Sequence, residues 1–449
     1  MMEKLFGIQA KGSTIPTEII AGAATFMTMS YIIFVQPIIL SGAGMNLEAV
    51  FVATCLASAA ATLVMGLVAN YPIALAPAMG HNVLFVIIAT TVAAQGAAGE
   101  PAWPRVLGAV FIAGCVFMVL SLFRFRARLV DAIPESLKNA IAVGIGLLIT
   151  LVGLEYAGLV VDSESTLVFI GDILSPHVLL VLGGTLFIAI LLIYRVKGAI
   201  LWGILATALG GLLLGIVKYE GLVAAPPSLA PTLFRLDIGG ALTVDFLVVI
   251  FVFLFLDLFD TVGTLIGVSE RGGLMVEGRL PRIGRAFFSD AFGTVFGALL
   301  GTSTVTSYVE STAGINAGGR TGLANVVTAA LFLLALFFVP LVRMVGGAYI
   351  LEGQLPLYPV IAPALLIVGV FMMAGVRKID WDDYTEAVPA FFTLIIMPFA
   401  FSIAEGIGFG FVTYSLLKLA AGRGKEVRPF VYACAGVFII LIVLRRFFL

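Results

Sequence analysis

The sequence is poor in charged residues. Only 11% of its 449 residues are Asp, Glu, Lys or Arg, against about 25% in an ordinary soluble domain. Hydrophobic residues make up 61% of the chain, and the mean hydropathy is +1.15. So few charges cannot cover a water-soluble globule, which excludes a soluble enzyme, a nucleic-acid-binding protein and a disordered chain. The net charge of −1 gives no attraction for a polyanion.

Cysteine and histidine are also scarce. The chain has three Cys, at positions 55, 115 and 434, and two His. The Cys residues have no CxxC spacing, so neither a disulfide scaffold nor a structural zinc site is expected. No cofactor motif or phosphate-binding loop is present either. We therefore expect no cofactor and no bound metal, and any energy the protein uses should come from an ion gradient rather than from ATP.

Long apolar runs make up most of the sequence. A membrane-spanning helix needs about 20 largely apolar residues, and the runs predict about fourteen crossings of an all-α polytopic membrane protein. The predicted spans are 18–42, 47–69, 71–95, 103–123, 136–154, 177–194, 197–217, 243–268, 285–300, 301–319, 323–342, 357–376, 386–402 and 405–421. Segment 423–449 is a basic linker followed by an apolar run, 429–444, which is either a further crossing or an interfacial helix.

The distribution of basic residues supports this count. With the N-terminus in the cytoplasm, most of the 25 Lys and Arg residues fall in predicted inside loops. The predicted outside loops hold only Arg105, Lys218, Arg235 and Arg343. This bias is typical of a multi-pass protein of a plasma membrane, here expected to be a prokaryotic inner membrane.

Two of the predicted spans are interrupted. Segment 71–95 contains Pro72, Pro77 and Gly80, which disfavour a continuous helix. Segment 301–319 begins with β-branched residues and is predicted to be extended up to about Tyr308. Irregular backbone at membrane depth is tolerated only where protein or a water-filled cavity satisfies it.

The two interruptions occupy corresponding positions in two halves of the chain. Seven spans separate them, and an odd number of spans inverts the second copy relative to the first. The pattern predicts a seven-plus-seven inverted repeat with two half-helix spans, each preceded by a short extended segment. In transporters, such paired broken helices indicate the substrate site.

Ionisable residues inside the spans are the second signal of a site. A carboxylate at the centre of a bilayer costs about 2.5–3.5 kcal/mol, yet span 243–268 carries Asp257 and Asp260, and the second broken span carries Glu310. On a helix, Asp257, Asp260, Thr261 and Thr264 form one polar stripe. We expect this stripe to face a cavity, with Asp257 the stronger candidate for contact with a ligand.

The half-helix starts provide further candidates. Asn82 and Glu310 are predicted to begin the two half-helices, whose free N–H groups and positive dipole ends favour polar ligands. Asn82 offers a donor and an acceptor, although it could instead cap its helix. Its neighbour His81 could line the cavity or be a satisfied structural residue.

Five stretches resemble the AzgA-type purine permeases of the nucleobase transporter (xanthine/uracil permease) family. They are TEIIAGAATFMTMSYIIFVQP (17–37), NYPIALAPAMGHN (70–82), FLDLFDTVGTLIGVSERGG (255–273), GTSTVTSYVESTAGINAGGRTGL (301–323) and DDYTEAVPAFFTLIIMPFAFSIAEGIGFGF (382–411). The resemblance implies proton-coupled uptake of adenine, guanine or hypoxanthine. It also implies a core domain (17–128 and 243–345) and a gate domain (132–218 and 346–422).

The base-binding positions of that family match Asn82, Asp257 and Glu310, and the glycine of its first break matches Gly80. Val309 and Ser311 flank Glu310 and complete the candidate substrate site. Asp257 is the candidate for proton coupling, with Asp260 and His81 as lesser candidates. The first break departs from the family's usual APGMGLN: this chain has Ala78 and His81 where that pattern has Gly and Leu.

Three alternatives stay open at this stage. The partner could be a purine nucleobase, or another nucleobase or small anion carried on the same fold, although no span centre offers the Arg or Lys that an anion would favour. An intramembrane aspartyl protease places its two Asp on separate helices, whereas Asp257 and Asp260 share one. Beyond the lipid bilayer, a homodimer is left open, and no nucleic-acid partner is expected.

Overall fold

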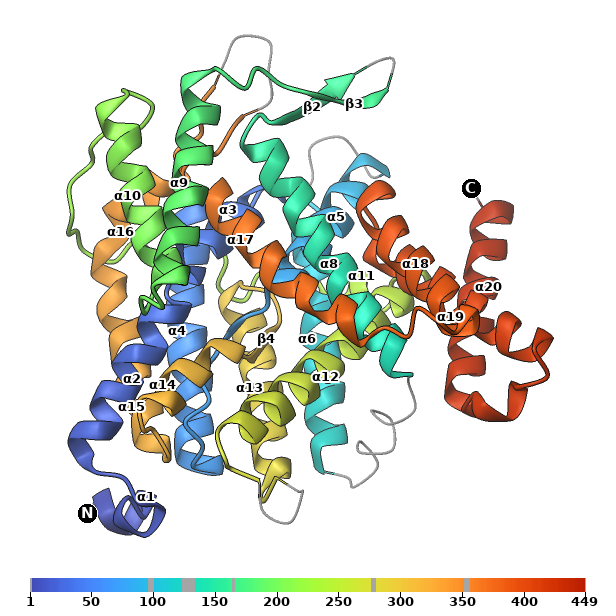
Figure 1. Cartoon of the computed structure of the whole chain (residues 1–449), viewed down its shortest axis with the longest axis horizontal. Helices are drawn as coiled ribbons and strands as arrows, with labels where there is room; N and C mark the ends of the chain where they lie inside the picture. The colour runs from blue at the N-terminus through green and yellow to red at the C-terminus, as the bar shows by residue number, and fades with distance from the viewer. Residues whose placement is uncertain are drawn as a thin grey trace. The chain divides into compact units, whose positions relative to one another are not determined.

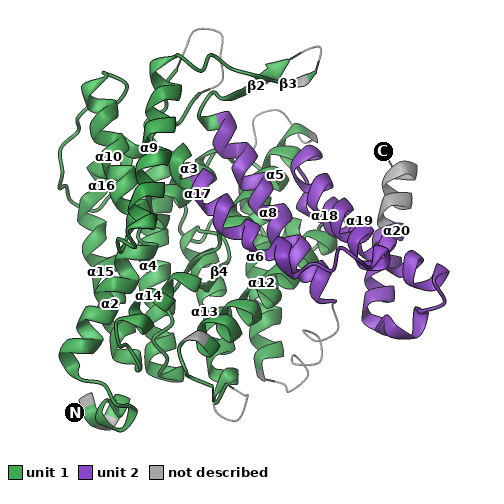
Figure 2. Cartoon of the chain, viewed as in Figure 1, with its two compact units in different colours: residues 1–123, 156–364 green, residues 124–155, 365–449 purple. Residues whose placement is uncertain are grey.

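The computed structural model describes residues 2–95, 101–122, 134–163, 166–275, 280–350 and 356–448. The chain divides into two compact units (Figure 2). Unit 1 comprises residues 1–123 and 156–364, and unit 2 comprises residues 124–155 and 365–449. The division into core and gate domains expected from the sequence stays a prediction.

Both units are built almost entirely from helices (Figure 1). The helices of unit 1 are α1 (Met2–Phe6), α2 (Ile15–Met29), α3 (Ile32–Ser41), α4 (Leu47–Val64), α5 (Met79–Gln95), α6 (Trp103–Leu122), α9 (Pro176–Ile193), α10 (Ala199–Leu213), α11 (Ile238–Ala241), α12 (Val244–Arg271), α13 (Ile283–Leu300), α14 (Thr312–Asn316), α15 (Gly322–Ala335) and α16 (Val339–Gly346). Most of α8 (Glu135–Tyr156) and of α17 (Ala362–Met372) belongs to unit 2, together with α18 (Tyr384–Phe399), α19 (Ile403–Ala420) and α20 (Pro429–Phe448).

Each of the fourteen predicted spans contains a helix. In the part of the chain that the structure describes, nine helical stretches are long and apolar enough to cross a bilayer, and four further apolar helices are shorter. The short ones include α5, in the first interrupted span, and α18, which carries Pro389 and Pro398. The apolar run 429–444 lies in helix α20.

The two interrupted spans meet in a small antiparallel sheet inside unit 1. Strand β1 (Leu75–Pro77) pairs with β4 (Val305–Ser307), with Leu75 opposite Ser307 and Pro77 opposite Val305. The pairing continues at both ends: Tyr308 N–H donates to the Ala74 carbonyl and Ala78 N–H to the Thr304 carbonyl, each at 2.9 Å. Strand β4 lies among α4, α12 and α13 (Figure 1). The extended segments expected before both half-helices are therefore confirmed.

Side chains from neighbouring helices satisfy the remaining backbone groups of the first break. The Thr62 hydroxyl on α4 donates to the Leu75 carbonyl (3.0 Å) and accepts from its N–H (2.9 Å). The Asn325 amide on α15 donates to the Ile73 carbonyl at 2.7 Å. Because lipid offers no hydrogen-bond partner, these contacts make an irregular segment tolerable at membrane depth.

The half-helices differ from the expected ones in their starts and lengths. Helix α5 begins at Met79, so Asn82 lies one turn inside it rather than at its start. The second half-helix is only a 3₁₀ turn, Val309–Ser311, followed by the five residues of α14. Helix α14 ends early because Gly318, two residues beyond it, adopts a left-handed conformation (φ 102°), which is typical of a helix end.

A close backbone approach joins the two halves of unit 1. The left-handed Asn70 (φ 54°) precedes the first break, and its side chain accepts from the Gly322 N–H at 2.7 Å, at the start of α15. A Cβ at Gly322 would overlap the carbonyl group of Gly66. Only glycine permits this contact between α15 and the end of the α4 span.

A second antiparallel pair lies outside the predicted spans. Strand β2 (Val160–Ser163) pairs with β3 (Leu167–Ile170), with Val160 opposite Ile170. Phe169 and Ile170 are exposed.

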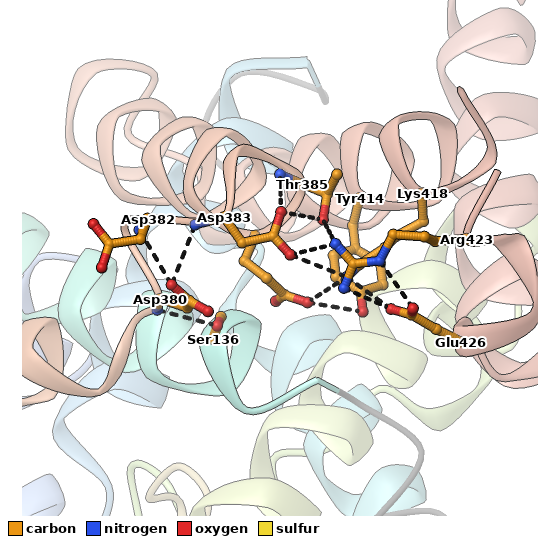
Figure 3. Close-up of polar contacts among 10 residues, drawn as sticks. Ser136, Asp380, Asp382, Asp383, Thr385, Tyr414, Lys418, Arg423 and Glu426 are labelled. Carbon is orange, nitrogen blue, oxygen red and sulfur yellow. Dashed lines mark hydrogen bonds and ion pairs between the residues drawn. The ribbon is translucent and has the colours of Figure 1, made fainter. Parts of the chain in front are cut away.

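In unit 2, an ion-pair network ties the start of α18 to the end of α19 (Figure 3). The Lys418 side chain is only 2% exposed, and its Nζ lies 2.9 Å from Glu386, 3.2 Å from Glu426 and 3.7 Å from Asp383. Arg423 contacts Asp383 at 2.6 Å and Glu426 at 2.9 Å. Hydrogen bonds from Thr385 and Arg423 hold the pKa of Asp383 well below its usual range. Asp383 therefore stays ionised under ordinary conditions.

We expect Lys418→Met to lower the stability of the protein. The change leaves Glu386 without its buried cation, and breaking a buried pair costs about 3 kcal/mol at the low end of the range. The thermal unfolding midpoint of the detergent-purified protein measures the effect. Arg423→Met is the control, because this partly exposed side chain should contribute less. Equal midpoints for the wild type and Lys418→Met would contradict the expectation.

Candidate functional site

The predicted site residues lie in unit 1, around the β1–β4 pair. They come from three places: the first turns of α5, the middle of α12, and the 3₁₀ turn that follows β4. Folding brings these segments together because β4 contacts both β1 and α12.

Asn82 is fully buried in α5. Its side-chain oxygen accepts a hydrogen bond from the Ser303 hydroxyl, in the extended segment of the second break. Its Nδ2 has no partner among the described residues. Gly80, one turn from the end of β1, is partly buried. The Asn82 side chain is thus held through its amide oxygen, and its amide nitrogen has no partner among the described residues.

His81 is 3% exposed and stacks on Phe253 of α12, with ring centroids 6.4 Å apart and ring planes at 27°. Its Nε2 has no partner within the described part of the chain. The ring that departs from the family pattern is therefore packed between α5 and α12, with one nitrogen unused.

Glu310 is held by the first span. Its Oε1 accepts from the Tyr31 hydroxyl at 2.8 Å, and its backbone carbonyl accepts from Thr28 at 3.3 Å. Its neighbours differ in setting: Val309 is 52% exposed, whereas Ser311 is fully buried and its hydroxyl accepts from the Ala74 N–H at 3.0 Å. Ser311 thus supports the first break directly.

The polar stripe of α12 divides into two faces. Asp257 is 2% exposed, and its Oδ2 lies 3.1 Å from the Thr294 hydroxyl of α13, while its Oδ1 has no partner in the described ranges. Asp260 lies on the exposed side of the helix. Asp257 and Thr261 therefore face α13, whereas Asp260 does not share their setting.

Sequence reasoning missed Asp290, a fully buried carboxylate on α13. Its two oxygens accept from the Thr261 hydroxyl (2.7 Å) and from the N–H and hydroxyl of Ser307 (2.9 and 2.8 Å). The signal was available, because Asp290 lies mid-span and is subject to the same cost as Asp257.

Gln36 and Tyr31 of the first span were also missed. Gln36 is fully buried and contacts Thr302 and Ser303, and Tyr31 contacts Glu310. Both are polar residues within an otherwise apolar span, which is a weaker signal than a carboxylate, since neither is charged.

The comparisons with known proteins agree with this arrangement. The model of a family described as "Permease family" matches residues 16–409. The chain belongs to this permease family. It is a membrane transporter rather than an enzyme, so the protease alternative is excluded.

Individual relatives cover nearly the whole chain. The adenine permease AdeP of Escherichia coli is 44% identical, over 99% of this chain and 96% of its own. The guanine/hypoxanthine permease PbuG of Bacillus subtilis is 43% identical, and the alignment covers 99% of this chain and 100% of PbuG. The nucleobase transporter PlAzg2 of Paenibacillus larvae is 33% identical, and the alignment covers 89% of this chain and 76% of PlAzg2. The resemblance found in the motifs is confirmed.

Solved structures with the same fold are far more distant in sequence. The transmembrane domain of the cyanobacterial bicarbonate transporter BicA gives a TM-score of 0.64 at 13% identity, covering 87% of this chain and 97% of its own. Murine Slc26a9 in the inward-facing state gives 0.63 at 10% identity, covering 94% and 72%. The predicted fold class of a multi-pass transporter with an inverted repeat is confirmed.

We expect Asp290→Ala to destabilise the protein. It would leave the buried N–H and hydroxyl of Ser307 without their acceptor, at a cost of about 2–4 kcal/mol in unfolding free energy. Denaturant unfolding in detergent measures the change. The control is the adjacent Ser289→Ala, which removes only a bond to the Arg285 carbonyl of its own helix and should cost about 1 kcal/mol or less. A similar loss in the two variants would show that Asp290 does not support β4.

Proposed function

We propose that this protein takes up purine nucleobases (adenine, guanine or hypoxanthine) by proton-coupled alternating access. The observation that carries the proposal is the paired break, β1 with β4, together with three buried polar atoms on α5 and α12 that have no partner among the described residues: Asn82 Nδ2, His81 Nε2 and Asp257 Oδ1. Buried polar groups are rarely left unsatisfied, so this cluster suits a small planar ligand with both donors and acceptors. Relatives that are named as adenine and guanine/hypoxanthine permeases support the substrate class.

In this proposal, Asn82, Asp257 and Glu310 contact the base, and Gly80, Val309 and Ser311 shape the site. Glu310 uses one oxygen for Tyr31, which leaves the other for an N–H of the base. The protein resides in a plasma membrane with its N-terminus in the cytoplasm, as the distribution of basic residues indicates. Motion of the core domain against the gate domain exposes the site alternately to the two sides.

Hydrogen counting supports Asp257 as the proton carrier. The Thr294 hydroxyl has a single hydrogen, yet it lies within hydrogen-bonding distance of both the Val305 carbonyl (3.0 Å) and Asp257 Oδ2 (3.1 Å). An ionised Asp257 competes with β4 for that hydrogen, whereas a protonated Asp257 donates its own and leaves Thr294 to β4. Protonation of Asp257 is thereby linked to the strand that shapes the site. Asp260 and His81 are the lesser candidates.

The function is tested by uptake into proteoliposomes. Labelled adenine, guanine, hypoxanthine and uracil are compared, with and without an imposed pH gradient. We expect concentrative uptake of at least one purine, and only when the outside is acidic. Uptake of uracil or of a small anion in preference to all three purines would contradict the proposed substrate. Equal uptake without the gradient would contradict proton coupling.

Glu310→Gln should weaken purine binding. The amide keeps an acceptor for Tyr31 but loses the charge, and a hydrogen bond to a charged group is worth about 1.5–3 kcal/mol. The dissociation constant of the purified protein should rise by roughly 10- to 150-fold. Glu48→Gln is the control, because Glu48 pairs with Arg343, away from the site. Unchanged affinity in Glu310→Gln would place the contact elsewhere.

Asp257→Asn should bind purine but fail at uphill uptake. The amide mimics the protonated carboxyl, so binding should lose its pH dependence while exchange of internal and external base persists. Asp260→Asn is the comparison and should retain some coupled transport. Both are measured as purine-driven proton movement in vesicles. Proton movement at the wild-type rate in Asp257→Asn would shift the assignment to Asp260 or His81.

A further inference from the structure

A chain of three buried amide and hydroxyl side chains begins on α3 and ends at Asn82. Gln36 Nε2 lies 2.8 Å from the Thr302 hydroxyl and 3.2 Å from the Ser303 hydroxyl, and Ser303 in turn donates to Asn82 Oδ1. The three residues of the chain, Gln36, Ser303 and Asn82, are fully buried, and so is Thr302. The chain connects the first span, the extended segment of the second break and the helix of the first break.

The orientation of the Gln36 amide sets the direction of this chain. Its nitrogen carries two hydrogens and lies toward two acceptors, Thr302 and Ser303. Because the Ser303 oxygen accepts from Gln36, its single hydrogen is free for Asn82 Oδ1. With Gln36 in this orientation, turning over the Asn82 amide alone would give Ser303 two donors.

The consequence is an Asn82 side chain with a defined polarity. Its oxygen is occupied, and the Nδ2 that remains is buried without a partner in the described part of the chain. A buried donor without an acceptor is rare in folded proteins and unfavourable. An acceptor on a bound ligand would satisfy it.

We infer that Gln36 and Ser303 are positioning residues that fix Asn82 as a hydrogen-bond donor, so that the base atom facing Asn82 is an acceptor. That atom is an unprotonated ring nitrogen or an exocyclic oxygen, and not an N–H group. The inference rests on the proposed function, since the ligand is the purine of that proposal. A purine carries donors and acceptors at different atoms, so a fixed Asn82 selects which of these atoms faces it.

The inference is tested with base analogues on the purified, full-length protein. In each analogue, one acceptor of the best-bound purine is removed: a ring nitrogen is replaced by C–H, or the exocyclic oxygen is omitted. In the wild type, we expect one analogue to bind about 5- to 150-fold more weakly than its parent, the effect of one buried donor left unpaired. The ratio of the two dissociation constants is the readout, because a purely structural defect would weaken both ligands alike.

Ser303→Ala releases the Asn82 amide, which can then turn away when the acceptor is missing. The ratio should fall to within about threefold of one, and Ser303→Thr, which keeps the hydroxyl, should restore it. Gln36→Met has a side chain of similar length but no donor for Ser303, so it should also lower the ratio. This variant replaces Ser303→Ala in the test if Ser303→Ala does not fold. The matched control is Thr302→Val, which removes the other acceptor of Gln36 but keeps the Ser303–Asn82 bond, and should retain the wild-type ratio.

Two results would overturn the inference with the proposed function intact. One is tight purine binding by the wild type without a penalty for any analogue. The other is a wild-type ratio in both Ser303→Ala and Gln36→Met. Failure of the wild type to bind any purine would instead contradict the proposed function, and the inference with it.

Discussion

The structure depends on one constraint, the satisfaction of backbone hydrogen bonds where the chain is not helical at membrane depth. Two interrupted spans would each leave unpaired N–H and C=O groups in an apolar surrounding. Pairing β1 with β4 satisfies backbone groups in both interrupted spans, because each strand supplies hydrogen-bond partners for the other. Thr62, Asn325 and Ser311 complete what the short strands cannot reach.

This solution explains why the polar residues of unit 1 gather where they do. A strand pair of three residues each is too short to be stable alone, so helices on either side must hold it. Asp290 and Thr294 of α13 bind both ends of β4, and Gln36 of α3 binds the segment before it. Thr294 also contacts Asp257, and Ser303, which accepts from Gln36, donates to Asn82. The side chains that support β4 and the segment before it therefore also contact the candidate site residues.

Unit 2 uses charge differently. Its network of Lys418, Glu386, Asp383, Glu426 and Arg423 lies at helix ends, where side chains from α18, α19 and the turn before α20 can meet (Figure 3). Asp383 also caps α18 through Thr385. These groups compensate one another, whereas Asp257, Asp290 and Glu310 of unit 1 are contacted by hydroxyl and backbone donors rather than by a basic side chain.

The sequence by itself determined the class of the protein, the spans and the two breaks, and it marked Asn82, Asp257 and Glu310 as candidate site residues. Hydropathy, proline and buried charge are local properties, and each leaves a mark in a short window. Tertiary structure alone decided that the breaks pair with each other, that Asp260 is exposed while Asp257 faces α13, and that the second half-helix is only a short turn. It also decided the roles of Asp290, Thr294 and Gln36. Their hydrogen-bond partners are 11 to 267 residues away in the chain, and no local pattern specifies a partner at that distance.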